Sequence, residues 1–207
     1  MDAITIEKNE AYLRQVSKDA NIHDERTKYE ISVLEKFCMN HDVMAMAAVQ
    51  IGIPKRIIYL KNTNLDVINR KNEGTSTLDD NNYNERRVLI NPIIVEQYGL
   101  TEYWEACASC LDYCGKVLRP YLMLVNYIDE NNEVKEEWFE GFEATVLSHE
   151  LDHLDGILHM DKAYDSVIIP QEYRMNLRQA EPYHIMSTYD EYEDLVAGFK
   201  PKRKTLR

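Results

Sequence analysis

The stretch Ser-His-Glu-Leu-Asp-His-Leu-Asp-Gly at residues 148–156 contains the pattern His-Glu-x-x-His. On an α-helix, side chains four residues apart lie on one face, so both imidazoles can bind a single metal ion. The glutamate between them can act as a general base on a water held by that ion. Phe142 and Val146 share the stripe of His149 and His153, which points the imidazoles toward the apolar interior. The alternative interpretation is two histidines that share a helix face without binding an ion.

The composition is that of one globular domain. The chain has 207 residues, of which 44% are hydrophobic and 29% charged, so it can bury a core without disulfides. Its net charge of -12 would repel phosphates and argues against a nucleic acid as partner. The sequence has neither an apolar run long enough to span a membrane nor the apolar core of a signal peptide. We therefore expect no membrane partner and a cytoplasmic location.

The order of the predicted elements indicates an α+β fold. A helix is expected from the N-cap Asp24 to about His41, after an irregular arm at residues 4–20. Five segments have strand character: residues 56–60, 88–95, 103–107, 122–128 and 134–139. The helix that carries His-Glu-x-x-His follows them. Strands that come in a run, rather than alternating with helices, predict antiparallel strands around a central helix.

Two segments lie outside this pattern. Residues 61–87 are rich in Asn, Asp and Thr, which predicts a polar insertion. After Lys162 the hydrophobic periodicity weakens. We therefore expect a catalytic domain over residues 1–165, with a partly irregular C-terminal extension over residues 166–207.

A third metal ligand must come from another part of the chain, since a catalytic ion usually has three protein ligands and one open position. The best candidates lie in Trp-Glu-Ala-Cys-Ala-Ser-Cys-Leu-Asp-Tyr-Cys at residues 104–114, because a thiolate binds borderline metals strongly. Cys107 and Cys110 are spaced as Cys-x-x-Cys, and Cys114 follows. Read from these residues alone, part of a structural zinc site is the alternative.

The sequence resembles the peptide deformylases in three short motifs that come in a fixed order. Residues 149–153 match the family's His-Glu-x-Asp-His. Residues 105–109, Glu-Ala-Cys-Ala-Ser, match Glu-Gly-Cys-Leu-Ser imperfectly, and residues 47–50 match the end of Gly-x-Gly-x-Ala-Ala-x-Gln. The resemblance covers roughly residues 4–162. It implies a peptide-deformylase-like fold and a metallohydrolase that removes the formyl group from the N-terminal formylmethionine of nascent polypeptides.

The resemblance also implies a set of metal ligands. Three residues would hold the ion: Cys107, His149 and His153. Cys110 is the alternative thiolate, by a slip of one turn. Asp152 would orient the ligands rather than bind the ion. The family implies Fe²⁺ as the ion in the cell, with Zn²⁺ or Ni²⁺ as substitutes in purified protein.

Further roles follow from the same resemblance. Glu150 would take a proton from the attacking water and pass it to the leaving amine. The side-chain amide of Gln50 and the backbone N–H of Ala108 would stabilise the oxyanion of the tetrahedral intermediate. Glu105 and Arg119 are expected to pair and brace the cysteine loop.

The departures from the family motifs lie on the substrate side. Val43 and Ala45 replace the two glycines of the first motif, while Ala106 and Ala108 replace the glycine and leucine of the second. We expect Val43, Ala45, Met46 and Ala106 to contact the substrate, a nascent formylated peptide, and we expect the protein to be a monomer. Two alternative functions remain: a paralogue with a shifted acyl or peptide specificity, or a non-catalytic module that binds peptide N-termini.

Overall fold

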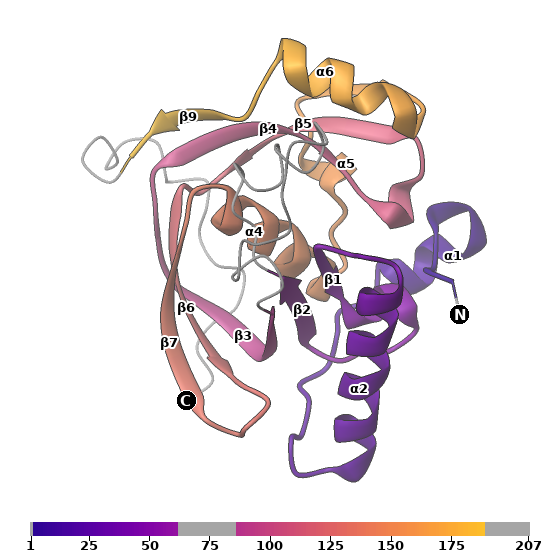
Figure 1. The fold of residues 1–207 in the computed structure, drawn as a ribbon, viewed down its shortest axis with the longest axis vertical. Helices are drawn as coiled ribbons and strands as arrows, with labels where there is room; N and C mark the ends of the chain where they lie inside the picture. Colours follow the sequence, from indigo (N-terminus) through magenta and orange to yellow (C-terminus); the bar gives the residue numbers. More distant parts are fainter. Residues whose placement is uncertain (1, 62–85, 189–207) are drawn as a thin grey trace.

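A computed structural model describes residues 2–61 and 86–188 of the chain (Figure 1). The helices in these ranges are α1 (Ile6–Leu13), α2 (Glu25–Asn40), α4 (Phe142–Leu154), α5 (His159–Lys162) and α6 (Arg174–Ala180). The short 3-10 turns are η1 (Ala48–Ile51), η2 (Ala108–Cys110) and η3 (Gln171–Tyr173). The strands are β1 (Ala45–Ala47), β2 (Ile57–Lys61), β3 (Arg86–Tyr98), β4 (Leu100–Ala106), β5 (Tyr113–Arg119), β6 (Leu122–Ile128), β7 (Val134–Glu140), β8 (Asp165–Ile168) and β9 (His184–Ser187). Most of the predicted insertion and the end of the predicted extension lie outside the described residues.

The strands form two antiparallel sheets. The first has the order β1-β2-β3-β6-β7, and the second has the order β8-β5-β4-β9. Helix α4 lies between them near the centre of the molecule, whereas α2 lies on the outside beside β1 and β2 (Figure 1). The predicted α+β fold with antiparallel strands is thereby confirmed.

Helix α4 is fixed by its apolar stripe. Ala144, Leu147, Leu151 and Leu154 recur at the helical spacing of three and four, and they are buried against strands of the first sheet. The strand residues of this cluster include Ile58, Leu89, Val125 and Phe139. Burial of this face holds the helix in one rotation about its axis, so the histidines project from it in a defined direction.

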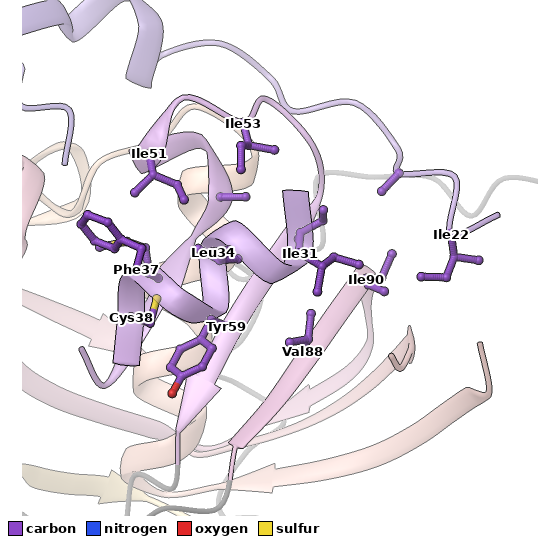
Figure 2. Packing of buried hydrophobic residues seen from close by; sticks show 14 residues of the cluster. Ile22, Ile31, Leu34, Phe37, Cys38, Ile51, Ile53, Tyr59, Val88 and Ile90 are labelled. Atoms are coloured by element: carbon purple, nitrogen blue, oxygen red, sulfur yellow. The ribbon is translucent and has the colours of Figure 1, made fainter. Parts of the chain in front are cut away.

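Helix α2 was predicted correctly, and its packing forms a second core (Figure 2). The side chain of Asp24 accepts a hydrogen bond from the backbone N–H of Arg26, as an N-cap does. Leu34, Phe37 and their neighbours pack on Tyr59 and other residues of β2 and β3. This cluster supports the outer face of the sheet to which β1 belongs.

The predicted irregular arm at residues 4–20 is wrong, because the chain forms α1 there. Thr5 caps this helix by accepting a hydrogen bond from the backbone N–H of Lys8. A kink at Asn9 interrupts the helical backbone, which explains why a continuous helical pattern is absent. Leu13, fully buried beside Cys107, anchors the helix through a contact distant in sequence.

The five predicted strand segments correspond to β2, β3, β4, β6 and β7. Four further strands were not predicted: β1, β5, β8 and β9. β5 contains Gly115 and the buried Arg119, so its sequence lacks the simple alternation of apolar and polar residues. β8 and β9 pair with β5 and β4, respectively, so part of the C-terminal extension completes the second sheet.

Candidate metal centre and active site

Two elements of the fold meet at one candidate metal site. Cys107 follows β4 and caps η2, while His149 and His153 project from successive turns of α4. One possible ligand atom from each residue lies within 4.8 Å of the other two. Cys107 Sγ is 3.2 Å from His153 Nε2, whereas bond lengths of about 2.0 and 2.3 Å around a tetrahedral ion give about 3.5 Å. Cys110 does not belong to this group of atoms.

The donor chemistry of this group fits a metal ion. His149 Nδ1 lies 2.8 Å from Glu105 Oε2, and donation of its hydrogen to that carboxylate leaves Nε2 as the ligand atom. A hydrogen bond from the Cys110 thiol, together with the charge of His153 and hydrogen bonds to both histidines, lowers the pKa of Cys107. A thiolate and imidazole nitrogens without protons are the forms that bind a metal. Within the described ranges, His153 Nδ1 is buried and has no hydrogen-bond partner.

A charged network lies directly behind the histidines. Arg119 donates to both oxygens of Glu105 at 2.7 and 2.8 Å, which is the pair expected from the sequence. Arg119 Nη1 also lies 2.5 Å from Asp152, whose other oxygen accepts from Lys162 at 2.7 Å. Burial alone would raise the pKa of Glu105, but the charge of Arg119 holds this pKa well below its usual range. The carboxylate therefore stays ionised and can fix the ring of His149.

Glu150 and Gln50 meet at one backbone group. The N–H of Ala47 donates to Glu150 Oε2 at 2.7 Å and to Gln50 Oε1 at 3.0 Å. The amide nitrogen of Gln50 is thereby turned toward Ser109 Oγ at 3.1 Å and Cys107 Sγ at 3.4 Å. Burial raises the pKa of Glu150. This arrangement places a carboxylate and an N–H donor beside the candidate metal ligands.

These groups line a cleft of about 880 Å³. The lining includes nine of the ten residues that the sequence analysis assigned to the site: Val43, Ala45, Met46, Gln50, Ala106, Cys107, Ala108, His149 and Glu150. His153, the tenth, is fully buried and does not line the cleft. Ala108 begins η2, and the first N–H groups of a helix have no acceptor within it, so this donor suits an oxyanion.

Two parts of the site were missed by the sequence analysis. Ser109 contacts Gln50, although no role in the site was predicted for this residue of the second motif. The other wall of the cleft comes from the C-terminal extension, through Gln171, Arg174, Met175 and Arg178. Their spacing of three and four residues is helical and was the available signal.

A thiolate and two imidazoles around one point, with a glutamate beside them in a cleft, define a class of protein. They are the parts of a hydrolase that uses a single metal ion and a carboxylate base. Comparison with known proteins gives the family. The chain belongs to the peptide deformylases, since the family model described as Polypeptide deformylase matches residues 2–167.

Individual relatives agree with this assignment. A peptide deformylase of Pelagibacter ubique is 33% identical over 151 residues, which are 72% of this chain and 78% of the relative. A probable peptide deformylase from Synechococcus phage S-SSM7 has a TM-score of 0.62 at 28% identity, covering 78% of this chain and 99% of that one. A Synechococcus elongatus peptide deformylase in complex with actinonin has a TM-score of 0.64 at 26% identity, covering 87% and 85%.

The expected family, fold and class of enzyme are therefore confirmed. The chain is a metal-dependent enzyme of the deformylase family, and the comparisons do not favour either alternative function. Among the described residues, no helix is both long and apolar enough to cross a membrane.

Proposed function

We propose that this protein removes the formyl group from the N-terminal formylmethionine of nascent polypeptides, with Fe²⁺ as its ion in the cell. Zn²⁺ or Ni²⁺ would replace it in purified material. The proposal rests above all on one observation: the helix carrying His-Glu-x-x-His meets Cys107 in a cleft large enough for a peptide end. Cys107, His149 and His153 would hold the ion, whose chemistry is that of a Lewis acid that makes water a better nucleophile.

Glu150 is suited to carry the proton. Its Oε2 is fixed by the N–H of Ala47, which leaves Oε1 to accept a proton from the attacking water. Burial raises its pKa toward the working range of a general base, so the same carboxyl group can return the proton to the leaving amine. The surrounding apolar side chains exclude bulk water and strengthen these interactions.

Gln50 and Ala108 are suited to stabilise negative charge on the formyl oxygen. Gln50 Nε2 is held beside Cys107 because its own carbonyl accepts from Ala47. Preorganised donors of this kind contribute about 2.7–4 kcal/mol each to the stability of the transition state. Val43, Ala45, Met46 and Ala106 line the same cleft and would contact the peptide.

The test is turnover of formyl-Met peptides by the Fe²⁺-loaded protein and its Glu150→Gln variant. We expect kcat to fall by about 10²- to 10⁴-fold in the variant, because the proton carrier is lost, while the metal content is retained. Glu143→Gln is the matched control, since this carboxylate lies in the same helix and pairs with Arg87 instead. No formyl-peptide turnover with Fe²⁺, Ni²⁺ or Zn²⁺, or an unimpaired Glu150→Gln, would refute the proposal.

We further propose that the protein acts in the cytoplasm as a monomer, without a nucleic-acid or membrane partner. Its net charge of -12 supports the absence of a nucleic-acid partner. Sedimentation of the metal-loaded protein should give one species of 24.3 kDa. A stable dimer, or co-sedimentation with RNA at physiological salt, would contradict this part of the proposal.

A further inference from the structure

One wall of the cleft comes from residues beyond the region that the family model matches. That region ends at residue 167, whereas η3 and α6 span residues 171–180. Gln171, Arg174, Met175 and Arg178 line the cleft and recur at the spacing of one helix face. In Figure 1, α6 lies across β4 and β5, the two strands on either side of Cys107. Two arginines and two glutamines, Gln171 and Gln179, give this wall a basic and largely polar character.

The wall is held against the second sheet by hydrogen bonds and by strand pairing on both sides of α6. Glu181, directly after α6, accepts hydrogen bonds from Trp104 Nε1 at 3.2 Å and Lys116 Nζ at 2.8 Å. β8 pairs with β5 before the helix, and β9 pairs with β4 after it. Since β4 also carries Glu105, the wall has a fixed position relative to the metal ligands.

Arg174 brings a cation with a free donor to this wall. One of its Nη nitrogens donates to the carbonyl of Leu111, and the nearest carboxylate oxygen, on Asp112, is 4.0 Å away. Its Nε is buried and has no hydrogen-bond partner anywhere in the described ranges. A buried guanidinium donor without an acceptor is costly, and an acceptor supplied by a ligand would relieve that cost.

Arg178 adds a second cation one turn further along. Its Nε donates to the carbonyl of Trp104 at 3.0 Å, and its guanidinium lies 5.0 Å from the centre of the Tyr103 ring. Across residues 2–61 and 86–188, no carboxylate lies within 4.0 Å of this group. Stacking on the ring fixes the plane of the fork while its two Nη nitrogens remain available for hydrogen bonds.

The acidic groups of the cleft are already engaged elsewhere. Glu105 is bound by Arg119 and His149, and one oxygen of Glu150 is bound by the Ala47 N–H. The two guanidinium groups therefore form a local positive site in a chain whose net charge is -12. A carboxylate is the acceptor that matches the planar fork of arginine.

We propose that Arg174 and Arg178 form a carboxylate-binding subsite for the part of the peptide that follows the formylmethionine. The inference rests on the proposed function, in which the formyl group occupies the metal site and the rest of the peptide extends along the cleft. Two sources can supply the carboxylate: an acidic side chain after the methionine, or the terminal carboxylate of a short peptide.

The experiment compares kcat/KM of the Fe²⁺-loaded protein for matched peptides. Formyl-Met-Glu-Ser amide against formyl-Met-Gln-Ser amide tests the side chain, and formyl-Met-Ala-Ser against its amide tests the terminus. We expect the carboxylate-bearing member of at least one pair to be favoured by about tenfold, mainly through KM. In Arg174→Gln/Arg178→Gln that ratio should fall to about one, whereas in the control Arg26→Gln, an exposed position on α2, it should persist.

A charge-reversal variant distinguishes the loss of carboxylate recognition from a disrupted wall structure. Arg174→Glu/Arg178→Glu should favour formyl-Met-Lys-Ser amide over the Glu peptide, a result that unfolding cannot produce. If the wild-type protein is active but hydrolyses both peptides of each pair with equal kcat/KM, the subsite is refuted. The deformylase function is then unaffected. If no formyl peptide is hydrolysed, the function fails, and the subsite is then judged by the dissociation constants of the same peptides for metal-loaded Glu150→Gln. Equal constants for both members of each pair would overturn it as well.

Discussion

Glu105 and Arg119 form a buried ion pair with two parallel hydrogen bonds, directly behind the candidate metal ligands. The same carboxylate accepts from Nδ1 of His149, while the same guanidinium contacts Asp152. One cation thus connects β4, the strand that Cys107 follows, to α4, the helix that carries the histidines. The relative placement of the three ligands depends on this pair.

Replacement of Arg119 by Met should therefore destabilise the fold. Two carboxylates would lose their buried partner, and breaking such a pair costs about 3–5 kcal/mol in the free energy of unfolding. Urea denaturation measures the change. The control is Arg26→Met. The Arg26 side chain is 79% exposed, and its partner Glu30 keeps a second ion pair with Lys55, so this loss should cost at most about 1 kcal/mol. Equal decreases in the free energy of unfolding would show that the buried pair contributes no more to stability than the exposed one.

Replacement of Cys107 by Ser should abolish tight metal binding, and Cys110→Ser should not. Sγ of Cys107 lies with the ligand atoms of both histidines, whereas Cys110 lies outside this group and reaches the site only through Cys107. A serine hydroxyl is a much weaker ligand than a thiolate. Metal content after exhaustive dialysis against a chelator decides between the cysteines. Loss of metal from Cys110→Ser alone would reassign the ligand.

Replacement of His159 by Phe should stabilise the protein. His159 is 1% exposed, and neither of its ring nitrogens has a hydrogen-bond partner among the described residues. Each buried unsatisfied polar group costs about 1–3 kcal/mol, and phenylalanine keeps the ring that stacks on His149 without that cost. We expect a gain of about 1 kcal/mol or more in urea denaturation. His41→Phe, which removes a hydrogen bond to the carbonyl of Phe37, should bring no gain.

Replacement of Gly156 by Ala should disturb the junction of α4 with the N-terminal helix. Gly156 has a φ of +71°, and an added Cβ would lie 2.1 Å from the carbonyl oxygen of Arg14. Gly52 has a φ of +88° but no atom within 4 Å of such a Cβ, so Gly52→Ala isolates the cost of the backbone conformation. We expect Gly156→Ala to lower the melting temperature well beyond Gly52→Ala, with the difference due to the clash. Similar decreases in melting temperature for the two variants would show that the backbone at Arg14 shifts to accommodate the added Cβ.

Elements with strong local signals were predicted well. Helix α2 has its N-cap at Asp24, and β6 (Leu122–Ile128) has the predicted bounds. Capping and hydrophobic periodicity act between neighbours in sequence, so a single chain displays them directly. α1 was missed because it is short and kinked, and because the burial of Leu13 depends on a distant part of the chain.

The sequence by itself determined the chemistry of this protein. The helical period places the side chains of His149 and His153 on one face, with Glu150 next to them. The three ordered motifs identify the family before any tertiary contact is known. The family resemblance favoured Cys107 over Cys110, but only tertiary structure brings its sulfur within 4.8 Å of the histidine ligand atoms and places residues of α6 along the cleft. These placements depend on strand pairing and on buried ion pairs between residues far apart in sequence, which local periodicity does not encode.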